Sequence, residues 1–159
     1  MPTRTDRRAW DSAERALTGL ALAVSAGLLA VWLPNYLRWP LFWDAEHFAQ
    51  TAREWDAGVS LPYRDGTAYN WPGQIYLYWV GGKLLGWGRT AAVPLMDVLL
   101  LGSFGLGVLA WSRRCLGGRL PGALAWLGLV VFYLNCSFLL AGQRTWQAGL
   151  FAAAALMTA

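Results

Sequence analysis

The chain has 159 residues, of which 57% are hydrophobic and only 14% are charged, and its net charge at pH 7 is +4. Its mean hydropathy of +0.35 excludes an ordinary soluble globular domain and predicts a membrane protein. The positive charge requires no nucleic-acid partner, because basic residues that flank membrane-spanning segments account for it.

Long uncharged runs predict where the chain crosses a bilayer. A hydrocarbon core about 30 Å thick requires about 20 apolar helical residues. Residues 16–37, 91–111 and 120–141 meet this requirement, and only Asp97 interrupts the second run. The last run, 145–159, is too short to span, so we expect a truncated fourth helix in a fragment of a longer protein. The predicted fold is therefore all-α and polytopic, with three complete transmembrane helices and part of a fourth.

A cleaved signal peptide is the alternative interpretation of the first run, because basic residues precede it. The run ends in VWLPNYLRW, however, and these bulky residues do not form the small-residue pattern of a cleavage site. We therefore expect an uncleaved membrane anchor.

The distribution of arginine predicts the orientation of the spans. Residues 1–15 and 112–119 together hold seven arginines against three acidic residues, whereas residues 38–91 hold five basic and five acidic residues. Positively charged segments stay in the cytoplasm. The N-terminus and residues 112–119 are therefore expected to be cytoplasmic, and residues 38–90 to form an exterior loop of an inner or plasma membrane protein.

The exterior loop carries the pattern of a surface helix. In residues 44–58 the apolar side chains recur at helical spacing, and Thr51 falls on the opposite, polar face. The apolar face comprises Ala45, Phe48, Ala49, Ala52 and Trp55. We expect this amphipathic helix to lie along the membrane surface.

A turn-rich stretch and a second aromatic segment follow in the same loop. Prolines and glycines at residues 62, 66, 72 and 73 break the chain before QIYLYWVGGKLLGWG. Six of the 11 tryptophans lie in the loop, which favours a position at the membrane interface.

Polar residues near the membrane surface are the candidate functional groups. Asp44 has the position of a helix N-cap, and as a carboxylate just beyond the first span it is also a candidate general base. Glu46 is the alternative base or an orienting acid. His47 is either a surface histidine or a contact to phosphate or sugar. Asp97 is either a structural acid near a helix start with Arg89 nearby, or a functional group inside a span.

Four motifs occur in the order found in one enzyme family: WDAEHFAQTAREWDAG, LPYRDG, YNWPGQIYLYW and KLLGWGR. Over residues 10–102 the chain resembles the GT-C type membrane glycosyltransferases that use polyprenyl-phosphate sugars, a group that includes protein O-mannosyltransferases and aminoarabinose transferases. The resemblance implies an N-terminal part of an inverting transferase, with an exterior glycan, lipid or protein as acceptor. The family's catalytic acid falls on Asp44, and its second acid falls on Glu46 with an offset of one residue.

The resemblance also implies a site for the lipid phosphate. The family's Pro-rich crossing falls on residues 70–73, where an acid and a lysine are replaced by Asn70 and Trp71. Asn70 stays a candidate contact at this crossing, and the phosphate ligand is then expected among Arg64, Lys83 and Arg89. Phosphate is a good leaving group, so we expect neither a cofactor nor a metal.

Two other functional classes stay open. The chain could belong to a non-enzymatic membrane protein, such as a transporter or an assembly subunit. It could also be an inert truncated product. Transporters favour broken spans with polar residues near the midplane, and these spans have almost none.

Overall fold

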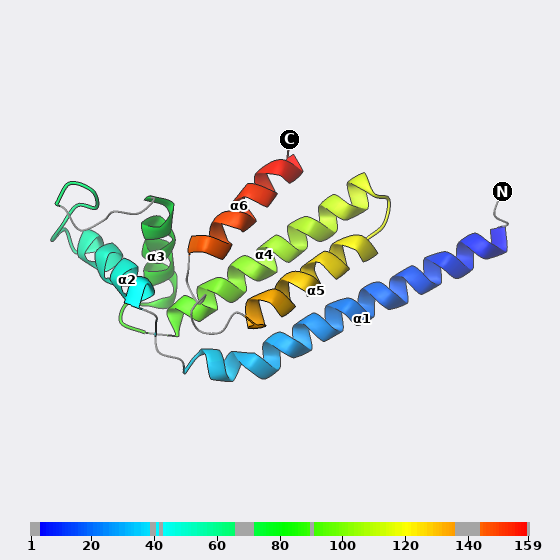
Figure 1. Ribbon diagram of the computed structural model, residues 1–159, viewed down its shortest axis with the longest axis horizontal. Coiled ribbons are helices and arrows are strands. Elements are labelled where there is room, and N and C mark those ends of the chain that lie inside the picture. Colours follow the sequence, from blue (N-terminus) through cyan, green and yellow to red (C-terminus); the bar gives the residue numbers. More distant parts are fainter. Residues whose placement is uncertain are drawn as a thin grey trace. The chain divides into compact units, whose positions relative to one another are not determined.

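A computed structural model describes residues 4–38, 41, 43–65, 72–89, 91–135 and 144–158. Within these ranges the chain forms six α-helices and no β-strand (Figure 1). The prediction of an all-α fold is confirmed. The helices are α1 (Arg4–Tyr36), α2 (Trp43–Asp56), α3 (Pro72–Leu85), α4 (Ala92–Cys115), α5 (Leu120–Asn135) and α6 (Arg144–Thr158).

Two of the described helices are long and apolar enough to cross a bilayer. They are the 28-residue stretch Ala9–Tyr36 of α1 and the 24 residues of α4. The apolar helices Leu120–Asn135 and Trp146–Thr158 are shorter. The predicted third span continues to residue 141, beyond the described part of α5, so its length stays a prediction.

Both long helices extend beyond their predicted hydrophobic runs. Helix α1 begins at Arg4 rather than at residue 16, and α4 continues to Cys115 rather than ending at residue 111. Alanine, arginine and glutamate in residues 4–15 favour helix, and the two arginines in the last turn of α4 interact favourably with the negative end of its dipole. Hydropathy therefore locates the apolar part of each helix but not its ends.

The chain divides into two compact units. The first unit contains α1 up to Leu33, α4 from Leu100 onward, α5, and α6 from Leu150 onward. The second unit contains Pro34–Leu99 and Ser137–Gly149, and therefore α2, α3 and the first turns of α4 and α6.

In the first unit, α4 and α5 form a helical hairpin (Figure 1), and hydrogen bonds hold its connecting turn. The Ser112 hydroxyl donates to the Gly118 carbonyl at 2.7 Å and accepts from the Gly122 amide at 3.1 Å. Glu14 of α1 accepts from the backbone amides of Arg119 and Leu120, at 2.8 and 3.4 Å. Because the first amides of a helix have no intrahelical acceptor, Glu14 caps α5 from a distant part of the chain.

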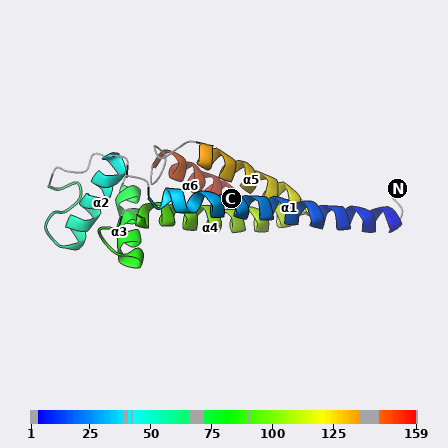
Figure 2. The same cartoon turned by 90° about the horizontal axis from the view of Figure 1, so that it is seen from below.

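In the second unit, α2 and α3 pack against each other (Figures 1 and 2). The predicted apolar face of α2 is confirmed, since Ala45, Phe48 and Ala52 are buried. Thr51 was predicted on the polar face and is buried instead. Its hydroxyl donates to the His47 carbonyl at 2.9 Å, so its polar atom is satisfied within the helix and its methyl group can face the core.

A glycine ends α2. Gly58 has a φ of 70°, and its amide donates to the Trp55 carbonyl at 3.0 Å. The amide of Val59 donates to the Glu54 carbonyl at 2.9 Å. This pair of bonds is the Schellman motif, which needs a residue with positive φ at the position after the helix. It directs the chain into the turn that approaches the start of α3.

Candidate functional site

A cavity of about 530 Å³ lies in the second unit, among α2, α3, the turn after α3 and the first turns of α4. Its apolar lining includes Leu41, Val93 and Met96. A ligand pocket for a small molecule commonly has this size and this mixture of apolar walls with a few polar groups. The polar lining is formed by Glu46, Gln50, Arg53, Glu54, Tyr78 and Arg89.

Glycines of α3 and of the following turn form part of the cavity wall. The Trp87 ring occupies the place where a Cβ atom of Gly82 would lie, so a larger residue at 82 would displace the indole. Gly86 has a φ of 93°, a conformation that other residues rarely adopt. These two glycines allow the chain to turn back directly over the end of α3.

The cavity brings together two residues that the sequence proposed separately, Glu46 and Arg89. It also contains Arg53, which the sequence analysis missed. Both carboxylate oxygens of Glu54 already accept hydrogen bonds, from Gln50 Nε2 at 2.9 Å and from the Ser60 hydroxyl at 3.2 Å. Within the described ranges, neither arginine of the cavity forms an ion pair. The cavity therefore offers two guanidinium groups and an exposed carboxylate to a ligand.

Asp44 was predicted at the N-cap of α2, but α2 begins at Trp43, so Asp44 lies inside the first turn; it is half-buried and does not line the cavity. Its charge acts on Tyr78, a buried tyrosine that does line the cavity. Burial raises the pKa of Tyr78 well above its usual range, and the charges of Asp97 and Asp44 act in the same direction, against a hydrogen bond with Gln74. Tyr78 is therefore a neutral hydroxyl at the cavity wall.

Lys83, a candidate phosphate ligand, is held by Asp56 and does not line the cavity. Its Nζ lies 2.6 Å from Asp56 Oδ1, and 5.8 Å from the centre of the Trp79 ring. The indole N–H groups of Trp79 and Trp87 donate to the two oxygens of Asp56 at 3.0 and 3.2 Å. These residues form a polar clasp that joins the end of α2 to α3 and to the turn after it.

The polar clasp also sets the protonation of Asp56. The hydrogen bond from Lys83 lowers the pKa of Asp56, and the indole donors add to this effect against desolvation, which raises the pKa. The sequence analysis missed Asp56, although its position near the end of a predicted helix indicates that it has a partner. An acid in the last turn of a helix interacts unfavourably with the helix dipole, which indicates a compensating partner elsewhere.

The remaining candidates lie apart from the cavity. Arg64 forms an ion pair with Asp65 at 3.1 Å and lines a different hollow. His47 is exposed on α2 and lines neither hollow. Asn70 lies outside the described residues.

Asp97 is fully buried and accepts a hydrogen bond from Gln147 Nε2 at 2.7 Å. The sequence suggested Arg89 as the neighbour of Asp97, but the structure shows Gln147 of α6 as a partner. Gln147 lies 50 positions further along the chain, so no local pattern indicated this pairing.

Among the described residues, no group of three or more histidines, cysteines and acids could hold a metal ion. Comparison of the chain with protein-family models, curated proteins and solved structures finds no match. The interpretation of the cavity therefore depends on its own chemistry.

Proposed function

We propose that the chain is the N-terminal part of an inverting GT-C type glycosyltransferase, and that its cavity holds the phosphate end of a polyprenyl-phosphate sugar. The observation that supports this proposal is the presence of Glu46 and Arg89 in one cavity of about 530 Å³. A carboxylate and a guanidinium are the groups that such a transfer needs, one for the acceptor proton and one for the departing phosphate. The proposal also includes the membrane topology. In it, the chain has three complete spans and part of a fourth, the N-terminus is cytoplasmic, and the long loop is exterior.

Each group has a defined part in the transfer. An acceptor hydroxyl attacks the anomeric carbon, and Glu46 takes the hydroxyl proton as the new glycosidic bond forms. The bond between that carbon and the phosphate oxygen breaks, and the polyprenyl phosphate leaves with the electron pair. Attack opposite the leaving group inverts the configuration. The charge that develops on the phosphate is stabilised by Arg89 and by Arg53.

The family resemblance places the catalytic acid at Asp44, whereas Glu46 is the acid that lines the cavity. Both acids therefore require a test. The whole transferase that would contain this chain is reconstituted in liposomes with a polar glycan acceptor and with undecaprenyl phosphate linked to glucose, mannose, galactose or aminoarabinose, and release of undecaprenyl phosphate is measured. We expect Glu46→Gln to lower kcat by about 10²- to 10⁴-fold, as removal of a general base does. A loss of kcat in Asp44→Asn alone would reassign the base, and wild-type protein without turnover on any donor would overturn the transferase.

Binding of undecaprenyl phosphate gives a second measurement that does not depend on turnover. Arg89→Ala should weaken this binding about tenfold, because one charge-assisted contact to phosphate is lost. Arg113→Ala is the matched control, since Arg113 is an exposed arginine in the last turn of α4 and lies outside the cavity. Equal binding by the two variants would contradict the phosphate site.

A further inference from the structure

A second hollow, of about 270 Å³, lies among the end of α2, the turn at residues 61–65 and the start of α3. Trp55, Tyr63 and Tyr76 form its aromatic walls, and the buried side chain of Ile75 also lines it. No residue lines both this hollow and the larger cavity. We call it the aromatic hollow. Its chemistry is therefore independent of the proposed transfer site.

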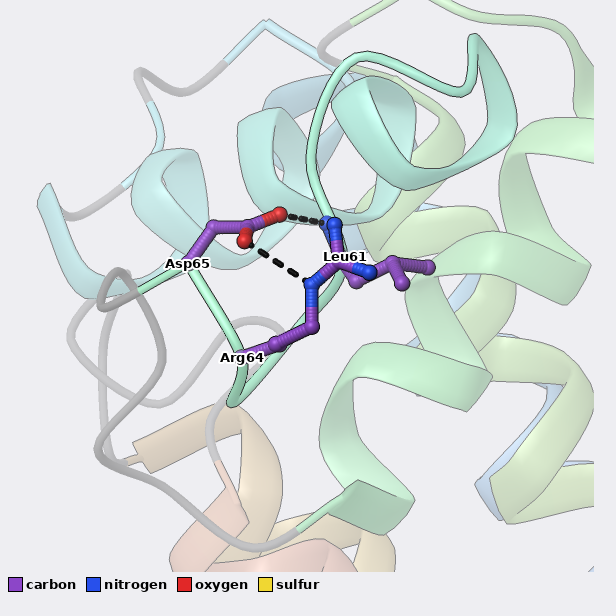
Figure 3. A network of polar contacts seen from close by, with 3 residues as sticks. All are labelled: Leu61, Arg64 and Asp65. Carbon is purple, nitrogen blue, oxygen red and sulfur yellow. Dashed lines mark hydrogen bonds and ion pairs between the residues drawn. The ribbon is translucent and has the colours of Figure 1, made fainter.

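Hydrogen bonds hold the turn beside the aromatic hollow in one conformation (Figure 3). Asp65 Oδ2 accepts from the Leu61 amide at 2.7 Å, and Asp65 Oδ1 pairs with Arg64 Nε at 3.1 Å. The Leu61 carbonyl accepts from the amides of residues 64 and 65, both at 3.2 Å. These bonds use both carboxylate oxygens, so the wall that the turn forms is built before any ligand arrives.

Tyr63 lies in this turn with an unusual backbone. Its φ is 71°, and it is the only non-glycine residue in the described ranges with a positive φ. A tyrosine rarely adopts this conformation, which glycine adopts without strain. Strained residues persist where the surrounding structure holds them, and they are concentrated at ligand sites. The strained backbone of Tyr63 therefore indicates that its ring contacts a ligand.

The aromatic walls are arranged by contacts among the rings themselves. The Trp55 ring meets the Tyr76 ring edge-on, with centroids 5.1 Å apart, and lies 5.6 Å from the Trp79 ring. Tyr63 and Tyr76 keep 45% and 54% of their surfaces exposed. The hollow thus presents aromatic surface to an incoming ligand without first breaking a packed core.

The charges of the aromatic hollow select the class of ligand. The charge of Arg64 is balanced by Asp65, so the hollow attracts anions weakly, and a phosphate gains little there. Burial raises the pKa of Tyr63, which keeps its phenol neutral as a hydrogen-bond donor. A purely apolar ligand would cover the Tyr63 phenol without offering it a hydrogen-bond acceptor. A ligand ring with an apolar face can stack on the aromatic walls, and its polar edge can accept the hydrogen bond of the phenol.

We propose that the aromatic hollow binds one neutral saccharide ring, which stacks on Tyr63 and Tyr76 and hydrogen-bonds with Arg64 and the phenol groups. This proposal goes beyond the transferase, because saccharide binding here requires neither Glu46 nor Arg89. The ligand is identified by its chemistry, as an uncharged pyranose.

The test uses saturation-transfer NMR on the purified protein with methyl mannoside, methyl glucoside and N-acetylglucosamine as probes. The protein is kept in a detergent without a sugar headgroup, because a maltoside would occupy the same site. We expect the wild-type protein to saturate the ring protons of at least one probe. The absence of such saturation with all three probes would overturn the proposal.

Tyr63→Gly separates binding from folding. Glycine accepts the positive φ, so this variant should keep the thermal stability of the wild type while losing one stacking wall. We expect at least a tenfold loss of affinity in this variant and in Tyr76→Ala, which corresponds to about 1.4 kcal/mol. Trp10→Ala is the control, because Trp10 is an exposed aromatic residue that lines neither hollow.

Three further outcomes are decisive. Wild-type affinity in Tyr63→Gly would overturn the site, as would equal losses in Tyr63→Gly and Trp10→Ala. Association of the aromatic hollow with lipid vesicles in place of saccharide would also overturn it and would indicate a membrane anchor. Glu46→Gln should bind saccharide normally, so a failure of the transferase and a failure of this site are distinguishable.

Discussion

At the scale of single residues, Asp56 joins three side chains of the second unit. It receives an ammonium and two indole donors, which come from α3 and from the turn after it. Because Trp87 and Gly82 also line the cavity, the polar clasp shapes the wall of the proposed phosphate site. Asp56 therefore holds residues of the cavity wall in place and does not itself line the cavity.

Replacing Asp56 by Asn should lower the melting temperature by a few degrees at pH 6, because the ion pair with Lys83 is lost. The folded-state pKa of Asp56 lies below its usual value, so the carboxylate contributes stability above about pH 4 and loses that contribution as pH falls through the folded pKa. The difference between wild type and variant should therefore shrink in acid. Thermal unfolding, monitored by tryptophan fluorescence, provides the measurement.

Asp11→Asn provides the matched control, since Asp11 is an exposed acid of α1. It should leave the melting temperature unchanged over the same pH range. A difference between wild type and Asp56→Asn that stays constant from pH 6 to pH 3 would show that the Asp56 carboxylate does not support the polar clasp.

At the scale of secondary-structure elements, the ends of the helices decide where the cavity walls lie. Gly58 ends α2 in a left-handed conformation, and Gly86 follows α3 with a positive φ. Each glycine permits a sharp change of direction that keeps α2, α3 and the following turn in contact. The lengths of the helices alone would not produce this arrangement.

Gly58→Ala should destabilise the protein by about 1 to 2 kcal/mol, which is the cost of a left-handed conformation for a residue with a Cβ atom. No atom lies within 4 Å of the added methyl group, so the effect comes from the backbone alone. Gly107→Ala is the counterpart, because Gly107 lies inside α4 with equally open surroundings and no positive φ. It should stabilise α4 by about 0.5 to 1 kcal/mol.

Chemical or thermal unfolding of both glycine variants in the same detergent tests this contrast. Opposite signs of the change in unfolding free energy are expected. Loss of stability in Gly107→Ala together with no loss in Gly58→Ala would contradict the assignment of the Schellman motif at the end of α2.

At the scale of the whole molecule, the orientation in the membrane can be tested with cysteine labelling. Val59→Cys lies in the predicted exterior loop, and the native Cys115 lies at the predicted cytoplasmic end of α4. In a Cys136→Ser background, a membrane-impermeant maleimide should label Val59→Cys in intact cells. It should label Cys115 only after the membrane is opened.

The two sites control for each other, since both Cys115 and Val59 are exposed in the structure. Labelling of Cys115 from outside, with protection of the cysteine at position 59, would invert the proposed topology. Labelling of both positions in intact cells would contradict the presence of a span between them.

Much of the helical fold follows from local sequence. The apolar spacing in residues 44–58 predicted α2 and its buried face, because a side-chain period near 3.6 is a property of the helix itself. Thr51 was misplaced because its hydroxyl can bond within the helix, which hydropathy does not record. The outer turns of α1 and α4 were missed because helix propensity extends beyond the apolar run.

The candidate site was predictable only in its residue types. Acidic and basic residues of the predicted exterior loop were named as candidate functional groups, and Glu46 and Arg89 were both among them. Which cation pairs with which acid depends on long-range packing, so Lys83 was proposed for phosphate although Asp56 holds it. Arg53 and Tyr78 were missed because nothing local marks a side chain as lining a cavity.

The sequence by itself determined the apolar helices and the amphipathic face of α2, because both depend on residues within a few turns of one another. Tertiary structure alone decided that Asp56 binds Lys83, that Gln147 meets Asp97, and that Glu46 shares a cavity with Arg89. The physical reason is that an ion pair or a cavity is formed by side chains from different helices, and their approach is set by packing over the whole unit rather than by any local spacing.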